Sequence, residues 1–268
     1  MAKGKNRVQH LGSQGTILSD KYADWDFIYD VTATKSNLYN IGDRVVLPDG
    51  RVFRYGLSSG ACWSGQGVCF IENGFQTYDN VVTSVAKGGK SVTIDGGTHD
   101  TIVVDQLRGG YVNFFVTDNT DNEFRGIVGN TAATTGVDFT LDLDASISTA
   151  YTTSTNCEIF WNPYSSLKNW VDGMTTNLSR AGLAAAYVSA SGRYFWVQTW
   201  GPCWIAPQTF SGATTNGRAG FFRHDGTIEP EIATASRTGL NTTQHAGFLI
   251  TEGDASGAGP LFMLQISP

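Results

Sequence analysis

The sequence predicts a mainly β protein, made of antiparallel sandwich or barrel units with short glycine-rich turns and few short helices. Three observations predict this fold class. Glycine is abundant, with 32 residues in the 268-residue chain. Charged residues make up only 16% of the chain, whereas an average globular domain holds about 25%. Short apolar stretches alternate with turn residues, and no amphipathic helical pattern is long enough to compete with them.

The clearest predicted hairpin lies at the start of the β-rich part of the chain. Residues 44–47 and 51–55 have the pattern of strands, and they flank Pro48-Asp49-Gly50. Proline presets the backbone φ angle of a turn and glycine adopts a positive φ, so this tripeptide favours a tight connection. Two neighbouring antiparallel strands are therefore expected here.

Further strands are expected along the rest of the chain. Residues 139–144 alternate between apolar and polar side chains, as a half-buried strand requires. In residues 165–182 the apolar side chains follow a helical spacing only briefly, so a short helix and an irregular linker both remain open. The other predicted strands cover residues 81–86, 91–95, 101–104, 111–117, 158–161, 183–189, 193–199, 220–223, 246–251 and 261–266.

The chain is expected to divide into an N-terminal extended arm and two β domains. The arm covers residues 1–40, the β domains cover residues 41–165 and 183–268, and residues 166–182 form a linker or short helix. The arm is basic at its start and has few turn signals, so it could dock on a neighbouring subunit. In the alternative interpretation its aromatic residues complete the core of the protein itself. The residues of the arm expected to contact a partner are Lys3, Lys5, Arg7, Tyr22, Trp25, Phe27 and Tyr29.

Charge and apolar patterning exclude several classes of partner. The net charge of −6 disfavours general binding to nucleic acid or to an anionic membrane. No apolar run approaches the roughly 20 residues of a membrane-spanning helix, and the first residues lack the apolar stretch of a signal peptide. We therefore expect synthesis in the cytoplasm, where the four cysteines would stay reduced.

Several short motifs resemble functional ones without their structural context. Ser58 stands in a G-x-S-x-G pattern, but the chain lacks the alternating strands and helices that hold a nucleophile elbow. Residues 87–91 resemble the end of a phosphate-binding loop, but Ser84 stands where that motif needs glycine. The oxygen-rich loop 118–123 could hold a cation, but Glu123 occupies the position at which an EF-hand needs glycine. We predict no catalytic residue, cofactor or metal ligand.

An aromatic stretch stands out in the second predicted β domain. In a strand, Trp196, Gln198 and Trp200 would share one face. Phe195 and Val197 would face the other way. Both faces are largely apolar, which indicates burial in a core or in a subunit interface. We therefore predict Trp196, Trp200 and Trp204 as interface residues. Exposed aromatic rings could also stack on sugars, which leaves a carbohydrate-binding role open.

The succession of several segments resembles the β-rich decoration or cement proteins of tailed-bacteriophage capsids. The resemblance runs from about residue 40 to the C-terminus, and residues 1–40 show no match. The segments are residues 42–55 (GDRVVLPDGRVFRY), 108–112 (RGGYV), 162–164 (NPY), 193–201 (RYFWVQTWG) and 262–268 (FMLQISP).

The resemblance implies a non-enzymatic virion structural protein. Copies would sit on the outer capsid surface, with trimers favoured, and would clamp neighbouring subunits of the major capsid protein. It supplies no catalytic residues to transfer. Two alternatives remain open from the residues: a carbohydrate- or receptor-binding head fibre or tail-associated module, and a polysaccharide-degrading enzyme, for which no pair of acidic residues stands out.

Overall fold

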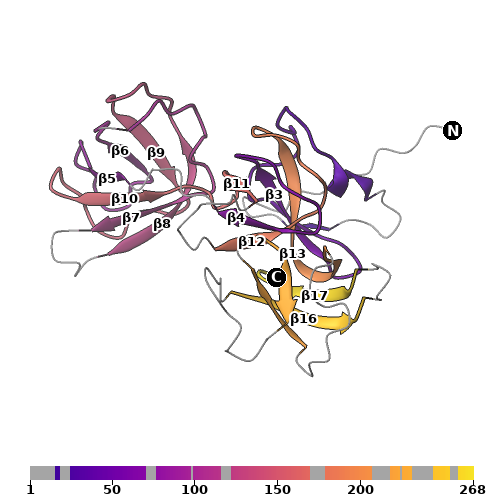
Figure 1. Ribbon diagram of the computed structural model, residues 1–268. Coiled ribbons are helices and arrows are strands. Elements are labelled where there is room, and N and C mark those ends of the chain that lie inside the picture. The colour runs from indigo at the N-terminus through magenta and orange to yellow at the C-terminus, as the bar shows by residue number, and fades with distance from the viewer. Residues whose placement is uncertain are drawn as a thin grey trace. The chain divides into compact units, whose positions relative to one another are not determined.

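A computed structural model describes residues 16–18, 25–70, 77–97, 99–115, 122–169, 179–206, 218–223, 225–230, 244–253 and 259–268. The fold is mainly β, as the sequence predicts (Figure 1). The chain divides into two compact units: unit 1 consists of residues 1–71 and 164–268, and unit 2 consists of residues 72–163.

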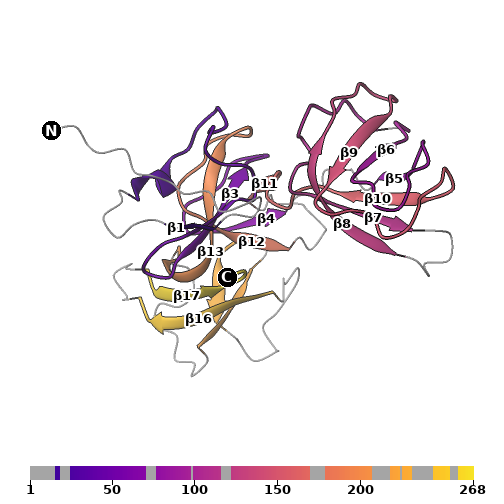
Figure 2. The ribbon, with the colours of Figure 1, turned by 180° about the vertical axis from the view of Figure 1, so that it is seen from behind.

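Unit 1 is built around an 11-stranded sheet. Its main path runs, in spatial order, through β1 (Thr16–Leu18), β2 (Arg44–Val46), β3 (Val52–Leu57), β13 (Tyr194–Trp204), β17 (Leu261–Gln265), β16 (His245–Thr251), β14 (Ala219–Phe222) and β15 (Ile228–Pro230). Three strands branch from this path, namely β4 (Gly67–Phe70), β11 (Leu167–Lys168) and β12 (Arg180–Ala184). Figure 2 shows β1, β3 and β13 in the same part of the unit.

The 11-residue strand β13 organises unit 1. Its first part pairs with β3 and β12, and its last part, from Trp200 to Trp204, pairs with β17. Both faces are covered near the start, because Trp196 belongs to one buried cluster and Phe195 to another. The register shifts between Gln198 and Trp200, so the strand changes partners at an irregularity.

The hairpin predicted around Pro48-Asp49-Gly50 is present. Strands β2 and β3 pair antiparallel, with Val46 opposite Val52. Gly50 has a φ of 86°, and its N–H donates to the carbonyl oxygen of Leu47 at 2.9 Å. The turn chemistry in the sequence thus corresponds to the observed backbone.

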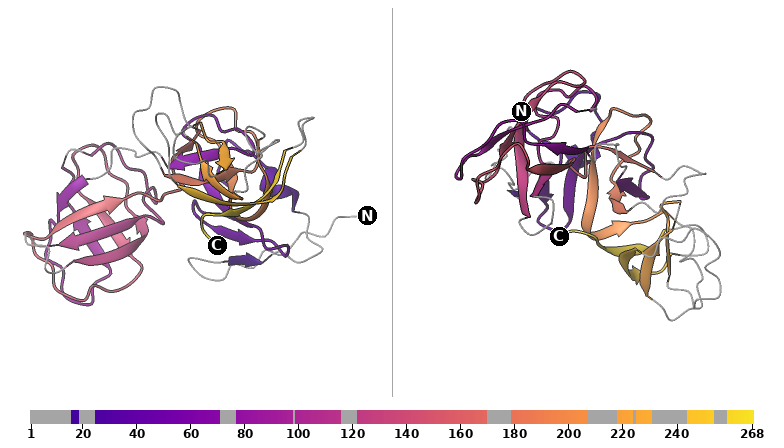
Figure 3. Two further views of the ribbon diagram at one scale, coloured as in Figure 1. Left: turned by 60° about the horizontal axis from the view of Figure 1, so that its bottom comes forward. Right: turned by 90° about the vertical axis from the view of Figure 1, so that its left-hand side faces the viewer.

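Unit 2 is a six-stranded antiparallel sheet that curls back on itself (Figure 3). The strand order is β5 (Thr77–Asn80), β10 (Asn156–Phe160), β7 (Tyr111–Phe115), β8 (Glu123–Asn130), β9 (Phe139–Leu143) and β6 (Ser91–Ile94). The two ends of this path meet, because Val81 bridges Ile94 and the N–H of Val82 donates to the carbonyl oxygen of Thr93 at 3.0 Å. This closure leaves one enclosed apolar core and makes the unit a small barrel.

Several predicted strands are shorter than expected. Residues 81–86 contribute only the isolated bridges of Val81 and Val85, and residues 101–104 contribute only the bridge of Ile102. Strands β1, β4, β5, β8, β11 and β15 lie outside the predicted strands. The sequences of β4, β5, β8 and β15 contain glycine, asparagine or proline at positions that weaken a periodic pattern.

The observed units differ from the predicted domains. Residues 44–57, expected in the same domain as residues 72–163, instead join the sheet of β13. Unit 2 leaves unit 1 after β4 and returns at β11, and these two strands pair through Phe70 and Leu167. The predicted linker 166–182 holds β11 and the start of β12, and residues 170–178 lie outside the described residues. Pairing between strands that are distant in sequence, such as β3 and β13, leaves no local signal.

The part of the predicted arm that the structure describes after β1 packs on unit 1. A 3₁₀ helix, η1 (Asp26–Tyr29), places Ile28 in a buried cluster, and Trp25 and Phe27 pack against the same cluster. The Phe27 ring lies 5.6 Å from that of Trp196, edge to face. The expectation of a detached arm is therefore corrected for residues 25–40, and the alternative interpretation describes them.

Candidate functional site

The hydroxyl group of Ser58 is engaged in hydrogen bonds to the backbone. Its side chain is buried, and its Oγ donates to the carbonyl oxygen of Ala190 at 2.8 Å and accepts from the N–H of Arg193 at 3.0 Å. These two bonds tie β3 to the turn that precedes β13. The G-x-S-x-G pattern therefore coincides with a cross-link between backbone segments.

The other motifs also lie in turns and cores. Residues 87–90 form a turn in which Gly88 has a φ of 93°. In the loop 118–123, residues 118–121 lie outside the described residues, and Glu123 binds the N–H of Ser148 and the hydroxyl of Tyr151. No group of three or more histidine, cysteine or acidic residues able to hold a metal ion occurs among the described residues.

The four cysteines are free and buried. Burial raises the pKa of Cys62 and of Cys203 to about 12. Cys69 lies beside Arg180, whose guanidinium also donates to the carbonyl oxygens of Gly67 and Arg223 at 3.1 and 2.8 Å. Cys69 and Arg180 join neighbouring strands of unit 1 through these bonds. All four thiols are buried and so lack the exposure of reactive cysteines.

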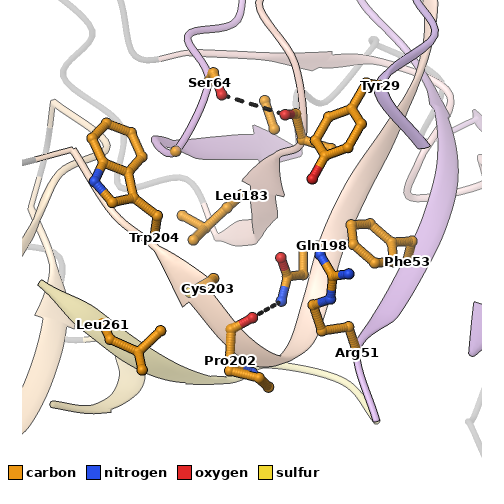
Figure 4. A pocket seen from close by; sticks show the side chains of 13 residues that line it. Tyr29, Arg51, Phe53, Ser64, Leu183, Gln198, Pro202, Cys203, Trp204 and Leu261 are labelled. Carbon is orange, nitrogen blue, oxygen red and sulfur yellow. Dashed lines mark hydrogen bonds between the residues drawn. The ribbon is translucent and has the colours of Figure 1, made fainter. Parts of the chain in front are cut away.

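A cavity of about 360 Å³ in unit 1 is the best candidate for a binding site (Figure 4). Small-molecule sites usually have volumes of about 300–1,000 Å³. Strands β3, β12 and β13 supply much of its lining, and η1 and the turn at residues 64–65 supply further parts. The residues whose chemistry matters most are Tyr29, Arg51, Phe53, Gln198, Trp204 and Leu261.

The side chain of Gln198 is almost fully buried and points into this cavity (Figure 4). Its Nε2 donates to the backbone carbonyl oxygens of Trp200, Gly201 and Pro202, at 3.2, 3.4 and 2.9 Å. These bonds brace the irregular segment of β13 and fix the orientation of the amide. The Oε1 atom accepts no hydrogen bond from any described residue.

Arg51 brings a guanidinium group to the same side of the cavity (Figure 4). Its Nε donates to Oδ2 of Asp49 at 2.7 Å, and its guanidinium carbon lies 5.7 Å from the centre of the Phe53 ring. Asp49 balances the positive charge, so the site offers oriented N–H donors without a strong net charge.

Tyr29 and Trp204 stand at the rim of the cavity, with 55% and 52% of their surface exposed. Two glycines give Trp204 its position. A Cβ atom at Gly65 would lie 2.7 Å from the indole, and one at Gly259 would lie 2.1 Å from it. Larger residues at these places would displace the ring.

The predicted interface aromatics have three different environments. Trp196 is buried within the core of unit 1, where it contacts the rings of Phe27, Tyr39 and Tyr55. Trp200 is half-buried, and Trp204 is exposed. An interface role is therefore corrected for Trp196, because the chain itself covers that ring.

The predicted arm residues are likewise not brought together. Tyr29 is exposed at the cavity, whereas Trp25 and Phe27 pack on the core. Lys3, Lys5, Arg7 and Tyr22 lie outside the described residues.

Sequence reasoning missed an exposed aromatic pair, Trp63 and Tyr187. Their ring centroids are 4.9 Å apart, and 55% and 50% of their surfaces are exposed. They are far apart in the sequence and meet because Cys62 bridges Val188. The only local signal was a lone tryptophan in a glycine- and serine-rich turn.

Comparison with known proteins identifies no relative. No family description matches the chain, and no curated protein or solved structure matches it. In the part of the chain that the structure describes, no helix has the length and apolar character needed to cross a bilayer.

Proposed function

We propose that this chain is a virion structural protein that decorates the outer surface of a tailed-bacteriophage capsid and clamps neighbouring capsid subunits. The observation that carries the proposal is the exposed Trp63–Tyr187 pair on a β unit. The resemblance of residues 42–55 and the later segments to decoration proteins points to the same role.

The aromatic pair has the properties of a protein contact. Tryptophan and tyrosine are enriched among the residues that dominate binding energy in protein interfaces. Complete burial of a large apolar side chain contributes roughly 1.5–3 kcal/mol. Half of each ring is already packed, so its orientation is set before a partner arrives. A partner would therefore gain apolar contact at a small cost in side-chain order.

The bulk surface chemistry also supports a structural role. Charged residues are scarce, and serine, threonine and glycine are frequent. Such a neutral surface can be covered by neighbouring subunits without the desolvation of many charges. Because many copies would bind a symmetric shell, many weak contacts would together give strong overall binding. We propose the major capsid protein as the partner and a homotrimer as the assembly.

The residues before position 25 keep their proposed role in this function. Lys3, Lys5, Arg7 and Tyr22 belong to a basic, glycine-bearing segment that could reach a neighbouring subunit. The deletion of residues 1–15 tests the role of Lys3, Lys5 and Arg7 separately, because the deletion removes no residue of η1 or of the core clusters.

Capsid binding by purified protein tests the proposal. Capsids of the phage that encodes the chain, prepared without it, would be mixed with the wild-type protein and sedimented. We expect co-sedimentation, weakened about tenfold or more by Trp63→Ala. Phe124→Ala, which removes an equally exposed aromatic ring from unit 2, is the matched control. Wild-type protein that stays in the supernatant would refute the proposal.

A further inference from the structure

We propose that the cavity between η1, β3 and β13 binds a neutral sugar, with one pyranose ring of a glycan held between Trp204 and Tyr29. The inference goes beyond the capsid role and does not depend on it. It rests on three features of the cavity: an oriented acceptor, a set of charge-balanced donors and two exposed aromatic rings.

The acceptor is Oε1 of Gln198. Because Nε2 is committed to the carbonyl oxygens of Trp200, Gly201 and Pro202, the amide cannot rotate to hide its oxygen without losing these bonds. The oxygen is held in the cavity and accepts no hydrogen bond from a described residue (Figure 4). An oxygen held in this orientation and open to the cavity can accept a hydrogen bond from a donor on the occupant.

The donors are the terminal nitrogens of the Arg51 guanidinium. Its Nε already binds Asp49, and the Phe53 ring supports the guanidinium carbon. The remaining N–H groups face the side of the cavity where Gln198 lies (Figure 4). An occupant must therefore accept hydrogen bonds near Arg51 and donate one to Oε1 of Gln198. Hydroxyl groups do both, since each carries one donor and two acceptor lone pairs.

Charge and shape select the class of ligand. A carboxylate or phosphate could pair with Arg51, but Asp49 already offsets the charge of Arg51, and the anion would also meet the oxygen of Gln198. An apolar ligand would leave both polar groups without partners. A pyranose offers several hydroxyls on its edge and apolar C–H groups on its faces. The rings of Trp204 and Tyr29 at the rim can cover those faces.

The direct test is saturation-transfer and chemical-shift NMR on the full chain. The probes would be glucose, galactose, mannose and N-acetylglucosamine, with glucuronic acid as an anionic comparison. We expect at least one neutral sugar to bind, with glucuronic acid weaker by about tenfold or more. If none of the neutral sugars transfers saturation at millimolar concentration, the proposal fails.

Variants locate the binding. Trp204→Ala and Arg51→Met should each weaken the sugar by about tenfold or more, and Arg51→Met keeps the apolar stem over Phe53. Phe124→Ala, in unit 2, should leave the affinity unchanged because its ring is exposed outside the cavity. If Trp204→Ala does not fold, Trp204→Leu and Arg51→Met still decide the matter. Equal loss in Phe124→Ala would place the sugar elsewhere.

One alternative occupant is part of the test. The primary amide of a glutamine or asparagine side chain also combines an acceptor with a donor. A short glutamine-containing peptide that binds at the cavity while all sugars fail would overturn the sugar proposal in favour of a protein contact. None of these results bears on capsid sedimentation, which uses Trp63, so the failure of one proposal is distinguishable from the failure of the other.

Discussion

The packing of η1 on unit 1 predicts opposite outcomes for two neighbouring substitutions. Ile28 is 1% exposed and belongs to a core cluster, whereas Tyr29 is 55% exposed. Replacing a fully buried isoleucine with alanine destabilises proteins by about 2–5 kcal/mol. Substitutions of exposed side chains usually change the free energy of unfolding by less than about 0.5 kcal/mol. We expect Ile28→Ala to fall in the first range and Tyr29→Ala in the second.

Urea unfolding followed by tryptophan fluorescence measures this difference. Six of the seven tryptophans lie in the residues of unit 1, so the signal reports mainly on that unit. With a slope of about 1–3 kcal/mol per molar urea, the Ile28→Ala midpoint should fall by about 0.7 M or more. An Ile28→Ala midpoint equal to that of Tyr29→Ala would show that the segment is detached from the core, and the reasoning would be refuted.

Three further predictions concern stability and reactivity. Burial alone would raise the pKa of Glu123, but hydrogen bonds from Tyr151 and the backbone, with a nearby arginine, lower it overall. The hydrogen bond between Tyr151 and ionised Glu123 therefore stabilises unit 2 at pH values above the ordinary carboxyl pKa, and this stabilisation is lost as the pH falls through the lowered pKa. Tyr151→Phe should lower the free energy of unfolding by about 1–3 kcal/mol at pH 7 and by less in acid. A loss that is the same at both pH values would contradict this prediction. Gly247→Ala should prevent stable folding of unit 1, since its Cβ would lie 1.9 Å from a carbonyl oxygen of β17; a melting temperature like the wild type would disprove the packing. Cys62 and Cys203, with pKa values raised to about 12 by burial, should react with a thiol reagent at pH 8 only after unfolding, and rapid labelling of the native protein would show otherwise.

Local sequence signals identified the elements whose structure depends on nearby residues. The turn at Pro48-Asp49-Gly50 joins two strands that pair within a dozen residues, so turn chemistry and alternation sufficed. The pairing of β3 with β13 joins residues about 140 positions apart, and the polarity pattern of either strand contains nothing about its partner. The domain boundaries were missed for this reason.

The candidate sites depend even more on tertiary structure. Trp196 and Trp204 lie on the same strand, yet one residue is 2% and the other 52% exposed. The difference arises because η1 and Tyr39 cover the Trp196 ring, whereas the Trp204 indole lies against the backbone of Gly65 and Gly259 and stays open to solvent on its other side. Gln198 was placed on the correct strand, but its role depends on three backbone carbonyls beyond an irregularity in that strand.

The number of copies of this chain in purified phage particles tests the central claim most directly. Quantitative mass spectrometry would compare its abundance with that of the major capsid protein, and a cryo-electron-microscopy map of the same particles would locate it. A decoration role predicts an abundance that scales with the capsid subunits, and density for two small β units on the outer shell. Absence from the particles, or a few copies confined to the tail or a fibre, would contradict the proposed function.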